Sequence, residues 1–187
     1  MKQQISHSDA VPPLLEGAGG GAILITGGQR SGKSSYAQKL ALSLSPNPVY
    51  LATSRVWDDE HRKRIERHKA ERGCEWTNIE EEKELSLHDF TGRVVLLDCV
   101  TLWATNFFFD MQADVQSSLQ ALKTEFDKLI GQDARFIIVT NEIGMGEMSQ
   151  NEVQRKFADL QGWLNQYIAE KADKVYLMVS GIPLMVK

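Results

Sequence analysis

The sequence predicts an α/β fold of three layers with a mainly parallel central sheet, and three observations support this. Short runs of apolar and β-branched residues alternate along the chain with longer segments of helical periodicity. Some of these runs, such as VVLL at 94–97 and FIIV at 136–139, are wholly apolar, as is typical of parallel strands covered on both faces. A glycine-bearing loop joins the first predicted strand to the first predicted helix.

Length and composition are those of an ordinary globular domain. We expect the 187 residues to form one domain over 23–187, preceded by a flexible extension over 1–22 that is rich in glycine and contains a Pro-Pro pair. The net charge of −4 gives no reason to expect a nucleic-acid-binding surface. Two cysteines are too few for a disulfide framework, and no apolar run is long enough to span a bilayer. These features favour the cytoplasm.

The elements of the N-terminal half follow from periodicity and from helix-breaking residues. Pro46 and Pro48 end the first helix, and Asp58 or Asp59 and then Gly73 are suitable caps for a polar helix. The expected elements are a strand at 23–26, a helix at 33–44, a strand at 49–53, the polar helix at 58–72 and a strand at 75–79.

The C-terminal half continues the alternation. Residues 101–109 include Trp103 and three consecutive phenylalanines, which we expect in the core or at a subunit interface. In the last predicted helix, Phe157, Leu160 and Trp163 belong to the apolar face. The expected elements are a strand at 94–98, helices at 115–130 and 152–169, strands at 136–140 and 175–179, and a short C-terminal strand.

The segment ILITGGQRSGKSSY at 23–36 contains a phosphate-binding loop between a strand and a helix. Glycines at both ends of the loop allow close approach of the backbone, whose N–H groups and helix N-terminus then bind phosphate oxygens. The predicted fold is therefore that of a P-loop NTPase, with a triphosphate nucleotide and Mg²⁺ as its ligands. The predicted nucleotide-binding residues of the loop are Gly27, Gly28, Gln29, Arg30, Ser31, Gly32, Lys33 and Ser34.

Further polar residues stand where strands end. Thr26, Asp98 and the pair Asn141-Glu142 follow apolar strands, and we expect them to meet because ligands of parallel sheets bind beyond the carboxyl ends of the strands. Asp98 is the candidate acidic residue for Mg²⁺, with the hydroxyl of Ser34 as the second ligand. The alternative role for Asp98 is to cap the following helix. The motif that reads guanine in small GTPases, Asn-Lys-x-Asp, is absent.

The segment 58–72 is rich in cationic residues and contains His61 and His68, which are seven residues apart and share a helical face. A histidine there can act as base, proton carrier, metal ligand or covalent nucleophile. By composition alone, a histidine on a charged helix is more often a solvated surface residue.

Six motifs occur in order along the chain: GGQRSGKS, YLATS, DDEHRKRIERHKAERG, LLDCVT, TNEIGMG and VSGIP. Together they resemble the family of bifunctional adenosylcobinamide kinase / adenosylcobinamide-phosphate guanylyltransferases of cobalamin biosynthesis. The resemblance covers residues 23–187. A P-loop is shared by many families, whereas RIERHK combined with TNEIGMG is specific to this one.

The resemblance implies two activities. One moves the γ-phosphoryl group of ATP or GTP to the aminopropanol hydroxyl of adenosylcobinamide. The other transfers GMP from GTP to a histidine, releases pyrophosphate, and passes GMP to adenosylcobinamide phosphate to give adenosyl-GDP-cobinamide. The matching catalytic histidine is His68, with Lys33 as the catalytic residue of the loop, and His61 does not match the motif.

The resemblance also implies further nucleotide contacts, a corrinoid substrate and a homo-oligomer, usually a trimer. Glu80 would accept hydrogen bonds from guanine, and Asp98 stands where many relatives carry glutamate, which is one methylene longer. The implied contacts beyond the loop are Ala52, Thr53, Ser54, Lys69, Ala70, Glu71, Arg72, Glu80 and Asp98.

Two alternatives stay open at this point. One is an enzyme that has kept only the kinase or only the transferase, and the other is a nucleotide-binding regulatory module without transfer chemistry. The presence of His68 argues against loss of the transferase, and Lys33, Ser34 and Asp98 argue against an inactive module. The preferred nucleotide of the kinase step and the corrinoid contacts are not encoded in any motif.

Overall fold

The computed structural model describes residues 20–55, 73–146 and 148–187, and its centre is a seven-stranded sheet ordered β3-β2-β4-β5-β1-β6-β7. The first six strands of that order pair in parallel, and β7 pairs antiparallel with β6. The strands are β1 Gly21–Gly27, β2 Val49–Ala52, β3 Thr77–Glu80, β4 Val94–Asp98, β5 Arg135–Val139, β6 Lys174–Val179 and β7 Ile182–Met185.

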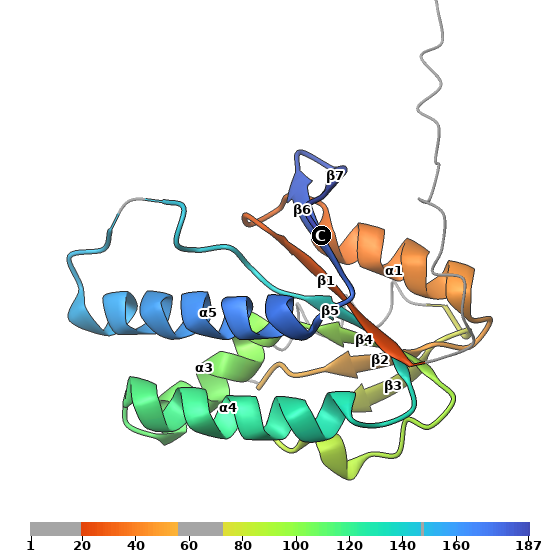
Figure 1. Ribbon diagram of the computed structural model, residues 1–187, viewed down its shortest axis with the longest axis horizontal. Coiled ribbons are helices and arrows are strands. Elements are labelled where there is room, and N and C mark those ends of the chain that lie inside the picture. Colours follow the sequence, from red (N-terminus) through yellow and green to blue (C-terminus); the bar gives the residue numbers. More distant parts are fainter. Residues whose placement is uncertain (1–19, 56–72, 147) are drawn as a thin grey trace, which may run out of the picture.

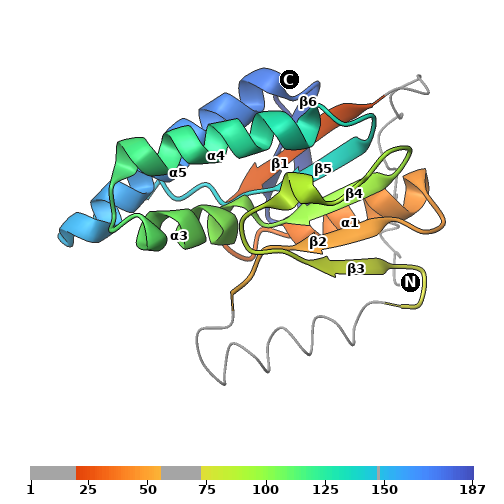
Figure 2. The same cartoon turned by 90° about the horizontal axis from the view of Figure 1, so that it is seen from below.

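Helices cover both faces of the sheet (Figure 1). One helix, α1 (Lys33–Leu44), packs on one face, while α3 (Val100–Asp110), α4 (Val115–Ile130) and α5 (Glu152–Lys171) pack on the other. Figure 2 shows the strands side by side from below, with α3, α4 and α5 grouped together, and the 3₁₀ turn η1 (Leu85–Leu87) contacts α4. The predicted three-layer α/β fold of P-loop type with a mainly parallel sheet is confirmed.

Alternate residues of the central strands supply two apolar layers, as the period of two in a strand requires. Leu24 and Leu97 belong to the larger layer, under α3, α4 and α5, where Trp103 and Phe126 are fully buried. Their strand neighbours on the opposite face, such as Ile25, pack against α1. The sheet is thus covered on both faces at its centre, which fixes the ends of the central strands.

The structure differs from the predicted elements at a few points. Residues 101–109 lie in α3, where Phe107 and Phe108 are buried and Phe109 is 54% exposed, so two of the three phenylalanines serve the core. The prediction that Trp163 lies on the buried face of α5 is wrong, because this side chain is 43% exposed. Strand limits agree to within two residues, and the predicted C-terminal strand is β7. The expected polar helix at 58–72 lies outside the described residues.

Candidate functional site

Two glycines give the loop between β1 and α1 its shape. Gly27 has φ +148°, and a Cβ there would lie 2.7 Å from the carbonyl oxygen of Met178. Gly32 has φ +95°, and a Cβ there would lie 3.1 Å from the Cα of Gly181. A side chain at either position would therefore meet backbone as well as an unfavourable φ. These two glycines are the ones that the phosphate-binding motif predicts.

The first turn of α1 begins without a side-chain cap. Its N-cap residue is Gly32, whereas Asp114 caps α4 by accepting from the amide of Ser117, and Asn151 caps α5 by accepting from Gln154. A helix N-terminus carries unpaired amides and a partial positive charge. At α1 these amides stand beside a glycine-rich loop, which is the arrangement that binds phosphate.

Lys33 directs its ammonium group into this loop. The side chain is only 7% exposed, and Nζ donates to the carbonyl oxygen of Gly28 at 2.6 Å. Burial lowers the pKa of Lys33 below its usual value, and the nearby Cys99 and Asp98 oppose that shift. The strand order β4-β5-β1 places the end of β4, where Asp98 stands, at the same edge of the sheet as this loop.

Asp98 is half-buried at the carboxyl end of β4, and its Oδ2 accepts a hydrogen bond of 2.6 Å from the hydroxyl of Tyr50. The next residue, Cys99, is buried, and burial together with Asp98 raises the pKa of its thiol to about 12. Burial thus favours the neutral thiol of Cys99, and a soft sulfur is a poor ligand for Mg²⁺. Asp98 and the half-buried hydroxyl of Ser34, in the first turn of α1, are the hard oxygen donors at this edge.

The two oxygen donors, Ser34 and Asp98, suit Mg²⁺ bound together with a nucleotide better than they suit a metal ion whose ligands all come from the protein. Within residues 20–55, 73–146 and 148–187, no group of three or more His, Cys, Asp or Glu side chains is arranged to hold a metal ion. Mg²⁺ is commonly held by one or two protein oxygens together with substrate phosphates and water. One carboxylate and one hydroxyl beside a phosphate-binding loop are consistent with that pattern.

The residues that follow β5, the strand next to β1, form hydrogen bonds with the end of β1 and the start of the loop. The amide of Glu142 donates to the carbonyl oxygen of Gly27 at 3.0 Å, and the amide of Thr140 donates to Ile25. Asn141 donates from its backbone and from its side chain to Oγ1 of Thr101, in the first turn of α3. The order β4-β5-β1 thus brings together the strand ends that the sequence predicts to meet.

Three residues at the carboxyl end of β2 are also predicted nucleotide contacts. Ala52 pairs with Asp98 in the β2–β4 register and has the small side chain that leaves the carboxylate accessible to Tyr50. Thr53 is fully buried and donates to the carbonyl oxygen of Cys99 at 2.8 Å, so its hydroxyl ties two strand ends together. Ser54 is half-buried beyond it. The roles of these residues toward a nucleotide stay predictions.

Glu80 does not lie beside the loop. It is the exposed last residue of β3, at the same carboxyl edge but four strands from β1, which corresponds to roughly 19 Å at the usual strand spacing. His68 and its neighbours Lys69, Ala70, Glu71 and Arg72 lie outside the described residues. Their predicted roles, like that of Glu80, stay predictions.

The chain enters residues 56–72 from Arg55, which is held by several ion pairs. Its guanidinium donates twice to Asp110 at the end of α3, at 2.9 and 3.1 Å, and once to Glu82 at 2.7 Å. Lys83 also contacts Asp110, at 3.1 Å. Sequence reasoning missed this cluster and Tyr50, because opposite charges and an aromatic residue far apart in the chain give no local signal.

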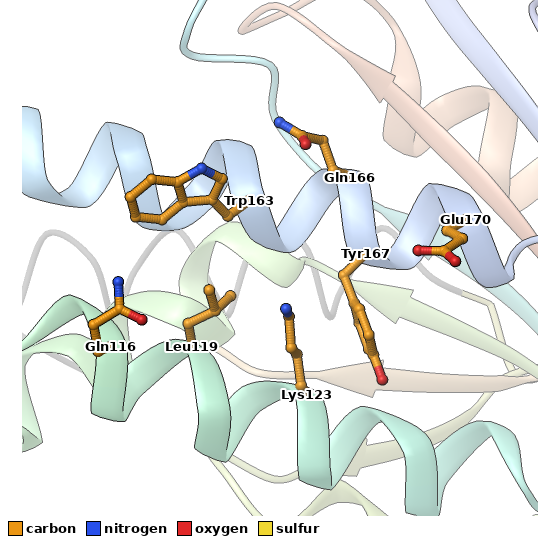
Figure 3. A pocket seen from close by; sticks show the side chains of 7 residues that line it. All are labelled: Gln116, Leu119, Lys123, Trp163, Gln166, Tyr167 and Glu170. Carbon is orange, nitrogen blue, oxygen red and sulfur yellow. The ribbon is translucent and has the colours of Figure 1, made fainter.

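A cavity of about 380 Å³ lies elsewhere, between α4 and α5 (Figure 3). Trp163 and Tyr167 extend into it from α5, and Lys123 from α4. These helices cover the face of the sheet opposite α1. None of the residues singled out by the phosphate-binding motif lines this cavity.

Among solved structures, the flagellar accessory protein FlaH from Methanocaldococcus jannaschii matches with a TM-score of 0.47 and 13% identity, over 90% of this chain and 79% of that one. An ATPase from the type III secretion system of pathogenic bacteria matches with a TM-score of 0.49 and 13% identity, over 84% of this chain and 50% of that one. In the described part of the chain, no helix has the length and apolar character needed to cross a membrane.

Curated relatives match over almost their full lengths. The bifunctional adenosylcobalamin biosynthesis protein CobU of Escherichia coli K12 is 39% identical, over 88% of this chain and 99% of its own. Its counterparts CobP of Pseudomonas aeruginosa and CobU of Salmonella typhimurium are each 37% identical, over 88% of this chain and 96% and 99% of theirs. The family described as CobU, cobinamide kinase / cobinamide phosphate guanyltransferase, matches residues 23–186. The chain therefore belongs to the cobinamide kinase / cobinamide phosphate guanyltransferase family.

Proposed function

We propose that this enzyme catalyses two consecutive steps of cobalamin biosynthesis. It phosphorylates adenosylcobinamide with ATP or GTP, and it transfers GMP from GTP, through guanylylated His68, to adenosylcobinamide phosphate. One observation carries the proposal: the ammonium of Lys33, the uncapped start of α1 and the carboxylate of Asp98 lie together at one edge of the sheet. This arrangement suits the triphosphate of a nucleotide.

In the kinase step, the aminopropanol hydroxyl of the corrinoid attacks the γ-phosphorus. A phosphorus–oxygen bond to the substrate forms, the bond to the β-phosphate oxygen breaks, and the hydroxyl proton is released. Lys33 and the amides of residues 28–34 neutralise charge that develops on the nucleoside diphosphate leaving group.

In the transfer step, a neutral imidazole nitrogen of His68 attacks the α-phosphorus of GTP, because imidazole is a good nucleophile near pH 7. A phosphorus–nitrogen bond forms, and pyrophosphate leaves with the electron pair of the broken bond. A phosphate oxygen of adenosylcobinamide phosphate then attacks the same phosphorus and displaces His68. Of the phosphates near Lys33, the γ-phosphoryl group is therefore transferred in the first reaction, whereas the β- and γ-phosphates leave together as pyrophosphate in the second.

Mg²⁺ would be held by Ser34 and Asp98 and would supply positive charge to the phosphate oxygens. We assign the remaining nucleotide contacts to residues 27–34, to Ala52, Thr53 and Ser54, to 69–72 and to Glu80. The corrinoid is the acceptor, the compartment is the cytoplasm, and a homotrimer is the expected assembly. The single folded domain over 23–187 belongs to the same proposal.

The test of the covalent step is incubation with GTP labelled at the α-phosphate, with Mg²⁺ and without corrinoid. We expect label on the protein that is stable to base and labile to acid, as a phosphorus–nitrogen bond is, and no label on His68→Ala. His61→Ala is the matched control, because it removes a histidine from the same segment and should label normally. A folded wild-type protein that takes up no label would contradict the covalent mechanism.

The kinase step is tested separately with γ-labelled ATP or GTP and adenosylcobinamide. Lys33→Ala should lose phosphorylation of the corrinoid, whereas His68→Ala should retain it. Full activity of Lys33→Ala would refute the role assigned to the loop. Loss of both reactions in both variants, with the proteins folded, would indicate that the two activities do not divide as proposed.

A further inference from the structure

Tyr50 on β2 forms a hydrogen bond with Asp98 on the neighbouring strand β4. Ala52 is the residue directly opposite Asp98 in the parallel register of β2 and β4, and Tyr50 stands two positions earlier on the same face. An aromatic side chain is long enough to span this diagonal. The hydroxyl of Tyr50 donates to Oδ2 of Asp98 at 2.6 Å, the short distance expected for a hydrogen bond to a charged acceptor.

The ring of Tyr50 is held firmly by its surroundings. The side chain is only 7% exposed and belongs to the apolar layer beneath α1, together with Leu96. The ring of Trp76 meets it edge to face, with 5.7 Å between centroids and an angle of 82°. Because the ring is fixed on these sides, the position of its hydroxyl is fixed as well, and so is the carboxylate oxygen that accepts from it.

This hydrogen bond gives the two carboxylate oxygens of Asp98 different surroundings. Oδ2 is engaged by Tyr50, and Oδ1 accepts no hydrogen bond from any other residue that the structure describes. Mg²⁺ requires nearly ideal octahedral geometry, so the orientation of a carboxylate that binds it, directly or through water, affects its affinity. Residues that orient metal-binding groups in this way contribute substantially to metal affinity.

We propose that Tyr50 is a positioning residue that fixes the carboxylate of Asp98, so that Oδ1 is directed to the Mg²⁺ of the bound nucleotide. This inference rests on the proposed function, in which Asp98 serves Mg²⁺. Tyr50 acts through Asp98 and does not itself contact the metal. A purely structural role for Tyr50 would reside in its ring, which phenylalanine preserves.

The test measures binding of Mn²⁺ to the complex of the protein with α,β-methylene GTP, an analogue that cannot donate GMP. Free Mn²⁺ is followed by its electron paramagnetic resonance signal. Tyr50→Phe should weaken Mn²⁺ binding roughly ten-fold, while binding of the analogue in EDTA stays unchanged. Tyr176→Phe is the matched control: this tyrosine is also buried and also packs edge to face on a ring, that of Tyr36, and its variant should bind Mn²⁺ normally.

A double-mutant cycle separates action through Asp98 from any other effect. In the Asp98→Asn background, the additional change Tyr50→Phe should have almost no effect on Mn²⁺ affinity. An equal loss in both backgrounds, or no loss in wild-type background, would overturn the inference. Failure of the wild-type protein to bind Mn²⁺ with the analogue would instead contradict the proposed function, and the inference with it.

A measurement on the unmodified protein covers the case in which Tyr50→Phe does not fold. The chain has four tyrosines, so their labelled ring carbons give four nuclear magnetic resonance signals, which variants of the other three assign. Adding Mg²⁺ to the analogue complex should shift the Cζ signal of Tyr50. The Cζ signal of Tyr167 should not change, because Tyr167 belongs to α5, on the other side of the sheet from α1. An unshifted Tyr50 signal would overturn the inference.

Discussion

The backbone amide of Gly181 donates a hydrogen bond of 2.9 Å to the carbonyl oxygen of Ser31, so the turn between β6 and β7 holds the phosphate-binding loop. The Cα of Gly181 is also the atom that a side chain at Gly32 would approach to 3.1 Å. The VSGIP motif therefore has a physical role. It contacts the loop at Ser31, whereas the residues after β5 contact it at Gly27.

Gly181→Ala is predicted to weaken nucleotide binding. Gly181 has φ +86°, a conformation that costs a residue with a Cβ about 1 kcal/mol, so the turn will relax and withdraw support from Ser31. Titration with a fluorescent GTP analogue measures the effect. Gly92→Ala is the matched control, because Gly92 has φ +72° and open space around it, in the turn before β4 at the opposite edge of the sheet. Equal loss of nucleotide affinity in both variants would contradict this role.

The sequence predicted much of this site because two kinds of signal are local. Gly27 and Gly32 follow from the loop motif, and the meeting of Thr26, Asp98 and Asn141 follows from the rule that parallel strands end at one edge. The observed order β4-β5-β1 confirms that meeting.

Other contacts have no local signal. The pairs Gly181–Ser31 and Tyr50–Asp98 join distant segments and depend on strand order and diagonal reach, which periodicity does not encode. The bounds of α3 have no local signal either, because apolar residues occupy most of its positions and residues 101–109 show no polar face at helical spacing.

Lys33→Met is predicted to abolish the kinase step and yet to raise the free energy of unfolding at pH 7, by about 1 kcal/mol. Burial lowers the pKa of Lys33. Between that lowered value and the ordinary value of 10.5, the unfolded chain binds more protons than the folded chain, so wild-type stability rises with pH. Methionine binds no proton, so its advantage should shrink as the pH approaches 10.

Urea denaturation of both proteins at pH 7 and pH 9.5 checks the Lys33 prediction. Lys39→Met removes an equal charge from an exposed position of the same helix and should change stability by less than about 0.5 kcal/mol. If Lys33→Met were less stable than wild type at pH 7, the hydrogen bond from Nζ to Gly28 would outweigh the cost of burying the charge.

Asn165→Ala is predicted to destabilise the protein by about 2 kcal/mol. Asn165 accepts from the hydroxyl of Thr140 at 2.7 Å and donates to the carbonyl oxygen of Asn141 at 3.1 Å, so its loss leaves two polar groups at the end of β5 without these partners. Gln161→Met removes two hydrogen bonds that Nε2 donates, to Thr140 and Asn165, but it should cost less because it also removes Oε1, a buried acceptor with no partner in the described structure. Denaturation curves that rank Gln161→Met as the more damaging variant would contradict this reading of the network.

Arg55→Ala is predicted to raise the pKa of Asp110 toward its ordinary value. Hydrogen bonds from Arg55, and then from Lys83, hold the pKa of this carboxyl well below the usual range. A carboxylate with a lowered pKa adds stability above its unfolded pKa, near 3.9, and loses that contribution as the pH falls through the folded value. Because both side chains are partly exposed, we expect Arg55→Ala to cost no more than about 1 kcal/mol at pH 7.

Carbon nuclear magnetic resonance titration of the Asp110 carboxyl group measures this pKa directly. Lys83→Ala is the matched comparison: it removes a single hydrogen bond at 3.1 Å, whereas Arg55 provides two to the same carboxylate, so Lys83→Ala should raise the pKa of Asp110 by less. Added salt should weaken the effect, because exposed charges are screened. A larger shift in Lys83→Ala than in Arg55→Ala would show that the arginine is not the principal partner of Asp110.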